Sequence, residues 1–115
     1  MKHSHFSAIE KEEVSLFGSE KTTVQWWTKR KDSEYFMMRK FEIGKNGHIG
    51  VHNHPEEHQM FVLKGPINLI DKDGRETKVD TGEFVYMPPN EKHGYNNPND
   101  YPVSFICCIP NLAES

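Results

Sequence analysis

The sequence has no long apolar run and no surplus of positive charge. A membrane-spanning helix needs about 18 or more consecutive apolar residues, and no segment of this 115-residue chain comes near that length. The first residues, MKHSHFSAIEKEE, are polar and mixed in charge, so we expect no signal peptide and a cytoplasmic protein. With 14 lysines and arginines against 17 acidic residues, we expect no nucleic-acid partner and no membrane partner.

Cysteine is scarce, and the two cysteines that are present, Cys107 and Cys108, are neighbours. Neighbouring residues of a strand point to opposite faces, so a disulfide between them would be strained. We therefore expect two reduced thiols and a reducing compartment.

Apolar residues at helical spacing are missing after residue 20, and period-two alternation takes their place. This pattern predicts one all-β domain, built as a sandwich or a barrel. The segment Ala8 to Phe17 reads as one short helix or an irregular arm, and the last four residues, 112–115, read as a terminal arm. Two glycines predict a turn over Gly44 to Gly47. The expected strands are Thr23 to Arg30, Tyr35 to Ile43, His58 to Gly65, Ile67 to Asp71, Arg75 to Val79, Glu83 to Met87 and Val103 to Ile109, with Met37, Phe41, Phe84, Tyr86 and Phe105 as core residues.

Histidine, in contrast, is frequent, with seven residues in 115. His52 and His54 are two residues apart, a spacing that puts both imidazoles on one face of a strand. His58 follows after a bend, and His93 lies beyond a Pro-Pro turn. An H-x-H pair alone is a weak signal, but a distant histidine that joins a local cluster is typical of a metal site between strands.

Two separated motifs in this chain resemble those of the cupin family of small β-barrels. The first family motif reads G-x5-H-x-H, then E after three or four residues, then G after six more. It maps onto Gly47, His52, His54, His58 and Gly65, with one residue fewer after the first glycine and histidine at the glutamate position.

The second family motif reads G-x5-P-x-G-x2-H-x3-N. It maps onto Gly82, Pro88, Asn90, His93 and Asn97 with every spacing kept. Only the second glycine is replaced, by Asn90, a residue type that also tolerates the left-handed backbone conformation. The resemblance covers about residues 36–110 and implies a single-domain cupin β-barrel (a double-stranded β-helix or jelly roll) over 23–111, after an N-terminal arm over 1–22.

The resemblance also implies one divalent transition metal per chain. Most cupins use three histidines and one glutamate, whereas a subset of single-domain cupins, which this chain looks like, has four histidines around a manganese-like ion. The implied ligands are His52, His54, His58 and His93, with Glu57 as the alternative to His58. Manganese is the expected metal, and iron, nickel or zinc also suit imidazole ligands.

Four neutral imidazoles leave the full 2+ charge on the metal, so the site favours an anionic, carboxylate-like small molecule. An octahedral ion would keep two open positions for such a ligand, whereas tetrahedral zinc would be saturated and only structural. Three readings therefore stay open. They are an enzyme of the dioxygenase, decarboxylase or isomerase type, a non-catalytic binding module or sensor, and a protein with a stabilising metal.

Other side chains are candidates for the cavity or for the surroundings of the metal. Met60 shares the face of His58, and Glu57 could orient an imidazole. His48 matches the ligands in strand parity but is expected to lie too far along the strand. Arg39 either reaches into the barrel to bind a carboxylate or lies on the surface. In similar cupins the N-terminal strands pack on a second subunit, so the resemblance implies a homodimer.

Overall fold

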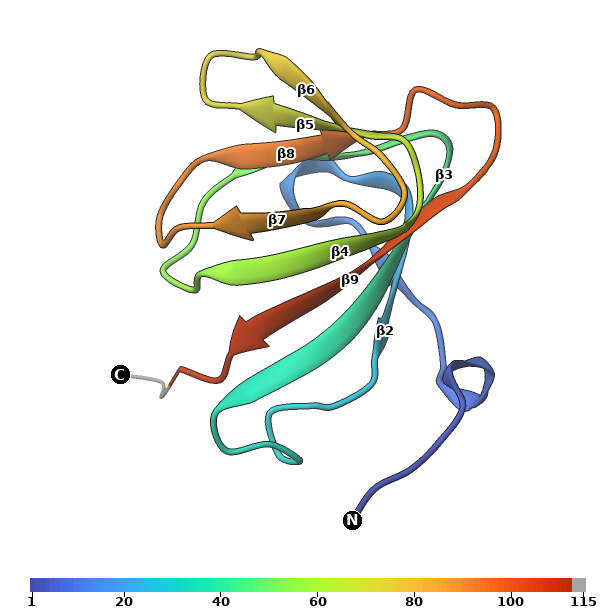
Figure 1. Cartoon of the computed structure of the whole chain (residues 1–115), viewed down its shortest axis with the longest axis vertical. Helices are drawn as coiled ribbons and strands as arrows, with labels where there is room; N and C mark the ends of the chain where they lie inside the picture. The colour runs from blue at the N-terminus through green and yellow to red at the C-terminus, as the bar shows by residue number, and fades with distance from the viewer. Residues whose placement is uncertain (113–115) are drawn as a thin grey trace.

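The computed structural model describes residues 1–112 of the chain, so the last three residues of the expected C-terminal arm lie outside the described residues. Within 1–112 the structure is all-β, with no α-helix, which confirms the predicted fold class (Figure 1). The elements in chain order are η1 (Phe6–Ala8), β1 (Glu12–Val14), η2 (Leu16–Gly18), β2 (Glu20–Trp26), β3 (Phe36–His52), β4 (His58–Lys64), β5 (Ile67–Asp71), β6 (Glu76–Val79), β7 (Phe84–Met87), β8 (His93–Asn96) and β9 (Val103–Pro110), where η marks a 3-10 helix.

The strands form a nearly closed antiparallel barrel in the order β6-β5-β8-β3-β9-β4-β7, and β2 and β1 extend it from β3. In Figure 1, β6, β5 and β8 lie above β7, β4 and β9. The long strand β3 joins these two layers, because its first part pairs with β9 and β2 while its last part pairs with β8. One end of the barrel thus collects the end of β3 and the starts of β4 and β8.

The turn expected over Gly44 to Gly47 is not formed, and β3 continues through it. The extra residues are absorbed by an irregularity in the pairing of β2 with β3, where Asn46 adopts a positive φ of 59°. A Cβ on Gly47 would lie 2.8 Å from the Glu20 carbonyl oxygen. The glycine therefore serves close packing of two strands, and not a chain reversal.

Asn97, the last residue of the second motif, anchors this irregular part of β3. Its buried side-chain amide donates hydrogen bonds to the carbonyl oxygens of Ile43 (3.0 Å), Gly44 (2.9 Å) and Tyr101 (2.8 Å). The positive φ of 65° at Asn90 confirms that asparagine stands in for the motif's second glycine in the left-handed region.

Alternation along β4 and β9 places the core as expected. His58, Met60 and Val62 of β4 are buried, and the residues between them are exposed. Phe105 is almost wholly buried and stacks on Phe41 with ring centroids 5.2 Å apart.

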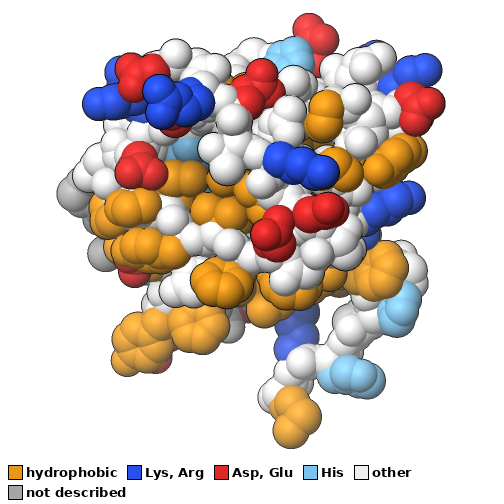
Figure 2. All heavy atoms as spheres, turned by 45° about the horizontal axis from the view of Figure 1, so that its top comes forward, with side chains coloured by type: hydrophobic (Ala, Val, Ile, Leu, Met, Phe, Trp, Pro, Cys, Tyr) orange, Lys and Arg blue, Asp and Glu red, His pale blue; other side chains and the backbone are white. Residues whose placement is uncertain are grey.

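The prediction that Phe84 and Tyr86 belong to the core is wrong. Phe84 is 82% exposed and Tyr86 49% exposed, because β7 is paired on its β4 side alone and both side chains face outward. With Phe36, Phe61 and Leu63 they make the outer surface of this layer apolar. Figure 2 shows apolar side chains gathered on one face of the molecule. The homodimer implied by the resemblance stays a prediction.

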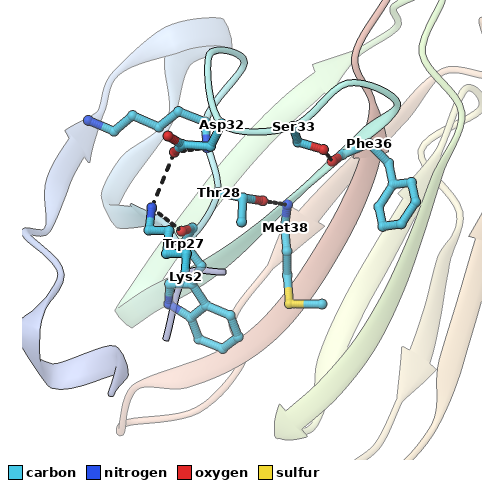
Figure 3. Close-up of polar contacts among 8 residues, drawn as sticks. Lys2, Trp27, Thr28, Asp32, Ser33, Phe36 and Met38 are labelled. Carbon is cyan, nitrogen blue, oxygen red and sulfur yellow. Dashed lines mark hydrogen bonds and ion pairs between the residues drawn. The ribbon is translucent and has the colours of Figure 1, made fainter. Parts of the chain in front are cut away.

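The N-terminal segment is tied to the barrel along its length. β1 pairs with β2, with Glu12 opposite Val24. Lys2 donates to the carbonyl oxygen of Trp27 at 3.0 Å and lies 3.2 Å from the Asp32 carboxylate, as Figure 3 shows for the loop after β2. Over Ala8 to Phe17 the structure forms parts of two 3-10 helices and strand β1, in place of a single helix.

None of the helices formed by residues 1–112 combines the length and the apolar character that crossing a membrane requires.

Candidate metal centre

Four histidine side chains meet at one end of the barrel, although they come from distant parts of the chain. His52 ends β3, His58 begins β4 and His93 begins β8, while His54 lies in the loop between β3 and β4. The register of β3 and β8 pairs His52 directly with His93. This pairing brings the distant histidine into the local cluster.

Three of these histidines form a compact triplet. The potential ligand atoms of His52, His54 and His93 all lie within 4.8 Å of one another. His58 borders the triplet on the buried side. Its Nε2 is 3.0 Å from Nε2 of His93, and its ring centroid is 4.8 Å from that of His54.

Backbone hydrogen bonds fix the protonation of the three triplet rings. Each Nδ1 contacts a carbonyl oxygen, which can only accept, so each Nδ1 carries the proton. In the neutral ring Nε2 then holds a free lone pair, the form in which imidazole binds a metal. The bonds join Nδ1 of His52 to the oxygen of Gly50 (2.8 Å), Nδ1 of His54 to that of Glu56 (2.8 Å) and Nδ1 of His93 to that of Glu91 (2.7 Å).

The fourth ring has a different partner. Nδ1 of His58 lies 3.0 Å from the Sγ of buried Cys107, and a thiol can donate or accept a hydrogen bond. Without a cation, the Cys107 thiol can donate to Nδ1 while Nε2–H of His58 donates to Nε2 of His93. With a cation on Nε2, the His58 ring carries its proton on Nδ1 and donates to Sγ. The donor set therefore fits a metal that prefers nitrogen ligands.

Burial keeps these rings neutral. It lowers the pKa of His58 to about 3, and the neighbouring imidazole of His93 acts in the same direction. Burial also lowers the pKa of His93 to about 4, although its hydrogen bond to the Glu91 carbonyl opposes the shift. The pKa of His52 is lowered as well, chiefly by burial. At neutral pH these lone pairs are thus free for a metal.

Glu57 and His48, two further candidates from the sequence, are not part of the cluster. Glu57 is exposed, and its carboxylate accepts a hydrogen bond from the Tyr86 hydroxyl on the outer surface. His48 lies farther back on β3, and its Nε2 donates to the Gly18 carbonyl oxygen at 2.9 Å. His58, and not Glu57, thus lies beside the triplet, and His48 contacts η2.

A cavity of about 400 Å³ opens beside the histidines. His52, His54 and His58 line it, whereas His93 does not. Much of the wall is aromatic, formed by Phe17, Trp26, Phe41, Tyr95 and Phe105.

The sequence left two positions open for Arg39, inside the barrel or on the surface. The structure places its side chain in the wall of this cavity. Arg39 interrupts an apolar inward row of β3, between Met37 and Phe41. Met60 is buried in the core and does not line the cavity.

Three residues at this site were not predicted from the sequence. Cys107 reaches His58 through the register of β9 with β4 and β3, which no local pattern reveals. Phe17 of η2 stacks on His52 with ring centroids 4.2 Å apart and an interplanar angle of 3°. Tyr95 could have been found, because it lies two residues after His93 and so shares its face of β8.

Comparison with known proteins places these features in context. A family model described as a cupin domain matches residues 39–109, more than half of the chain. A comparison with curated proteins found no significant match to this chain.

Several solved structures are similar. The polyketide cyclase RemF from Streptomyces resistomycificus superposes with a TM-score of 0.91 at 30% identity, and the alignment covers 97% of this chain and 80% of that chain. A predicted oxalate decarboxylase from Thermotoga maritima gives a TM-score of 0.84 at 17% identity, with 96% and 100% covered. An RmlC-like cupin from Shewanella frigidimarina gives 0.78 at 19% identity, with 99% and 95% covered. These last two similarities indicate a shared fold.

Proposed function

This chain belongs to the cupin domain family, and we propose that it is a metal-dependent enzyme. In this proposal His52, His54, His58 and His93 hold one divalent transition metal through their Nε2 atoms. The substrate is a small anionic molecule of the carboxylate or enolate type, bound in the adjoining cavity.

The direction of the imidazole lone pairs carries the proposal. Three Nδ1 atoms are committed to backbone carbonyls, so three Nε2 lone pairs point into one small volume. The Nε2 atoms of His58 and His93 approach to 3.0 Å, where two lone pairs repel unless a proton or a cation lies between them. A divalent metal would replace the Nε2–H proton of His58 in this position, and all four Nε2 lone pairs could then bind it.

The charge of the site supports an anionic substrate. Four neutral imidazoles would cancel none of the 2+ charge of the metal, and Arg39 adds a further positive charge in the same cavity, whose wall also includes Glu12 and Glu13. Manganese is proposed from the family resemblance, while iron, nickel and zinc are also compatible with imidazole ligands. When bound, the metal supplies Lewis acidity toward a substrate oxygen.

The chain's own residues would orient the substrate and exclude water from it. The aromatic wall favours a flat, partly apolar molecule, and Phe17 of this wall covers the His52 ring. Of the reactions that the sequence left open, none is favoured by this geometry alone. The 30% identity to a polyketide cyclase favours a further reaction, which is ring closure in a substrate with enolisable carbonyl groups.

The first test is metal content, measured by mass spectrometry on protein grown with added manganese or iron. We expect about one metal ion per chain. His52→Ala, His54→Ala and His93→Ala should each lose most of it, while His3→Ala, which removes an exposed imidazole from the N-terminal segment, should keep it. His58→Glu should retain metal but bind anions more weakly, because a carboxylate cancels one unit of charge.

Three outcomes would contradict the proposal. Full metal occupancy in the three alanine variants would remove the assigned ligands. Tightly held zinc under every growth condition would favour a stabilising metal in place of an enzyme. With metal confirmed, absence of turnover on carboxylates and β-dicarbonyl compounds, with and without dioxygen, would favour the binding module.

A further inference from the structure

Arg39 is a half-buried cation that forms no ion pair among the described residues. Its Nε is fully buried and makes no hydrogen bond, and its one polar contact joins Nη2 to the Cys107 Sγ at 3.8 Å. The ion pairs within residues 1–112 involve only Lys2 with Asp32 and Lys11 with Glu42. Leaving a charged donor buried and unpaired is costly, so its retention requires a reason.

The surroundings of Arg39 hold its side chain inside the cavity. The guanidinium carbon lies 5.1 Å from the ring centroid of Trp26 and 4.8 Å from that of Phe41. Strand pairing places Trp26 on one side of Arg39 and Cys107 on the other, so neither directly paired residue is a carboxylate. Glu12 and Glu13 of β1 also line the cavity, but neither forms an ion pair with Arg39. The contacts with Trp26 and Phe41 fix the cation in the wall without neutralising it.

Tyr95 presents a second unpartnered donor to the same cavity. The residue is only 2% exposed, and its hydroxyl makes no hydrogen bond. Its ring is held by Phe105, at a centroid distance of 5.2 Å, and by His93, at 5.7 Å. Both Arg39 and Tyr95 line the cavity that also contains the histidines.

We infer that Arg39 and Tyr95 form an oxyanion subsite that works without the metal, and that the ligand is a planar aromatic acid or enolate. An Arg N–H and a Tyr O–H both donate, so the group they bind must accept, as a carboxylate or enolate oxygen does. The flat side chains of Phe17, Trp26, Phe41 and Phe105 suit an aromatic body.

The position of this subsite gives the ligand two attachment points. Cys107 contacts both His58 and Arg39, so a single side chain separates the histidine cluster from the cation. A ligand with one oxygen group at each end of an aromatic body can therefore contact both. The arrangement of the metal end rests on the proposed function, whereas the Arg39–Tyr95 end does not.

The test is calorimetric titration of the full chain, both metal-free and manganese-loaded, with benzoate as the probe and benzamide as its neutral analogue. Metal-free protein should bind benzoate more tightly than benzamide. Arg39→Gln should weaken benzoate binding at least tenfold, and Tyr95→Phe several-fold. Arg75→Gln, the same change of charge on an exposed hairpin, should have no effect.

Thermal unfolding separates a binding role from a structural one. Because the Tyr95 hydroxyl has no hydrogen-bond partner, Tyr95→Phe should melt no lower than the wild type while losing benzoate affinity. Arg39→Gln also loses the contacts with Trp26, Phe41 and Cys107. Its loss of affinity is therefore judged together with that of Tyr95→Phe. Unchanged benzoate affinity in Arg39→Gln, or equal affinity for benzamide, would overturn the inference. If the protein holds no metal yet benzoate binding depends on Arg39, the proposed function fails and this subsite stands. If metal binds and Arg39→Gln leaves benzoate binding unchanged, the inference about this subsite fails and the proposed metal site stands.

Discussion

Cys107 differs from the carbonyl partners of His52, His54 and His93, because its thiol can both donate and accept a hydrogen bond. The carbonyl partners of His52, His54 and His93 allow one ring tautomer each, whereas Cys107 allows His58 two. Burial raises the pKa of the Cys107 thiol, which keeps it protonated. The thiol can therefore donate to Nδ1 of His58 in one tautomer and accept from it in the other.

We therefore expect Cys107→Ala to weaken metal binding about 10-fold to 100-fold, a common cost of losing the group that orients a ligand. Cys107→Ser should restore much of the affinity. Competition with a chelator gives the dissociation constant, and the ¹⁵N shifts of the His58 ring report the tautomer. Cys108→Ala is the matched control, since Cys108 points to the opposite face of β9. Equal affinity in Cys107→Ala and Cys108→Ala would show that the thiol does not position His58.

At the scale of elements, η2 and the end of β3 form one unit over the histidine cluster. Phe17 adopts a positive φ of 59° and stacks on His52, and His48 holds the Gly18 carbonyl. Gly50 packs directly against the backbone of η2, and a Cβ on Gly50 would overlap the Phe17 carbonyl oxygen. The absence of a side chain at Gly50 thus allows η2 to reach the site.

Gly50→Ala should accordingly lower the free energy of unfolding by about 1–3 kcal/mol, the usual cost of forcing an extra methyl group into a packed contact. It should also displace Phe17 from His52. Urea unfolding measures the first effect, and the ring-current shift of the His52 protons reports the second. Val51→Thr, a change at an exposed neighbouring side chain, should be close to neutral. Gly50→Ala unfolding at the same urea concentration as Val51→Thr would show that η2 does not rest on this glycine.

At the scale of the whole molecule, the buried histidines link stability to pH. The folded protein holds His58 and His93 neutral, with pKa values lowered from 6.5 to about 3 and about 4. As the pH falls below about 6.5, the unfolded chain takes up protons that the folded chain does not. Stability is therefore complete above this pH and is lost progressively down to about pH 4 for His93 and about pH 3 for His58.

Metal-free protein should thus unfold at lower urea concentration at pH 5 than at pH 7.5. The free energy of unfolding should fall by up to about 1.4 kcal/mol per pH unit for each of the two histidines. His58→Gln combined with His93→Gln should flatten this dependence over the same range. An equally steep dependence in the double variant would assign the effect to other groups.

Local patterns determined much of the fold. Period-two alternation in residues 58–64 and 103–110 predicted which side chains are buried, because a strand sends alternate residues to opposite faces. The two motifs predicted a cupin barrel, which the family match and the similarity to RemF confirm. Local patterns failed for β8, whose residues His-Gly-Tyr-Asn have little strand character, and at Gly44 to Gly47, where pairing on both sides overrides the turn signal.

The sequence by itself determined that histidines spaced as His52, His54 and His58 could share one face with a distant His93. Their closeness along the chain brings these three histidines together, although His54 lies in the loop after β3, and not on a strand as the i, i+2 spacing had predicted. Only the tertiary structure decided what surrounds them. Cys107 meets His58, and Arg39 turns inward beside Tyr95, because the register between strands brings these residues together. Register is set by packing across the whole barrel, so no local pattern contains it.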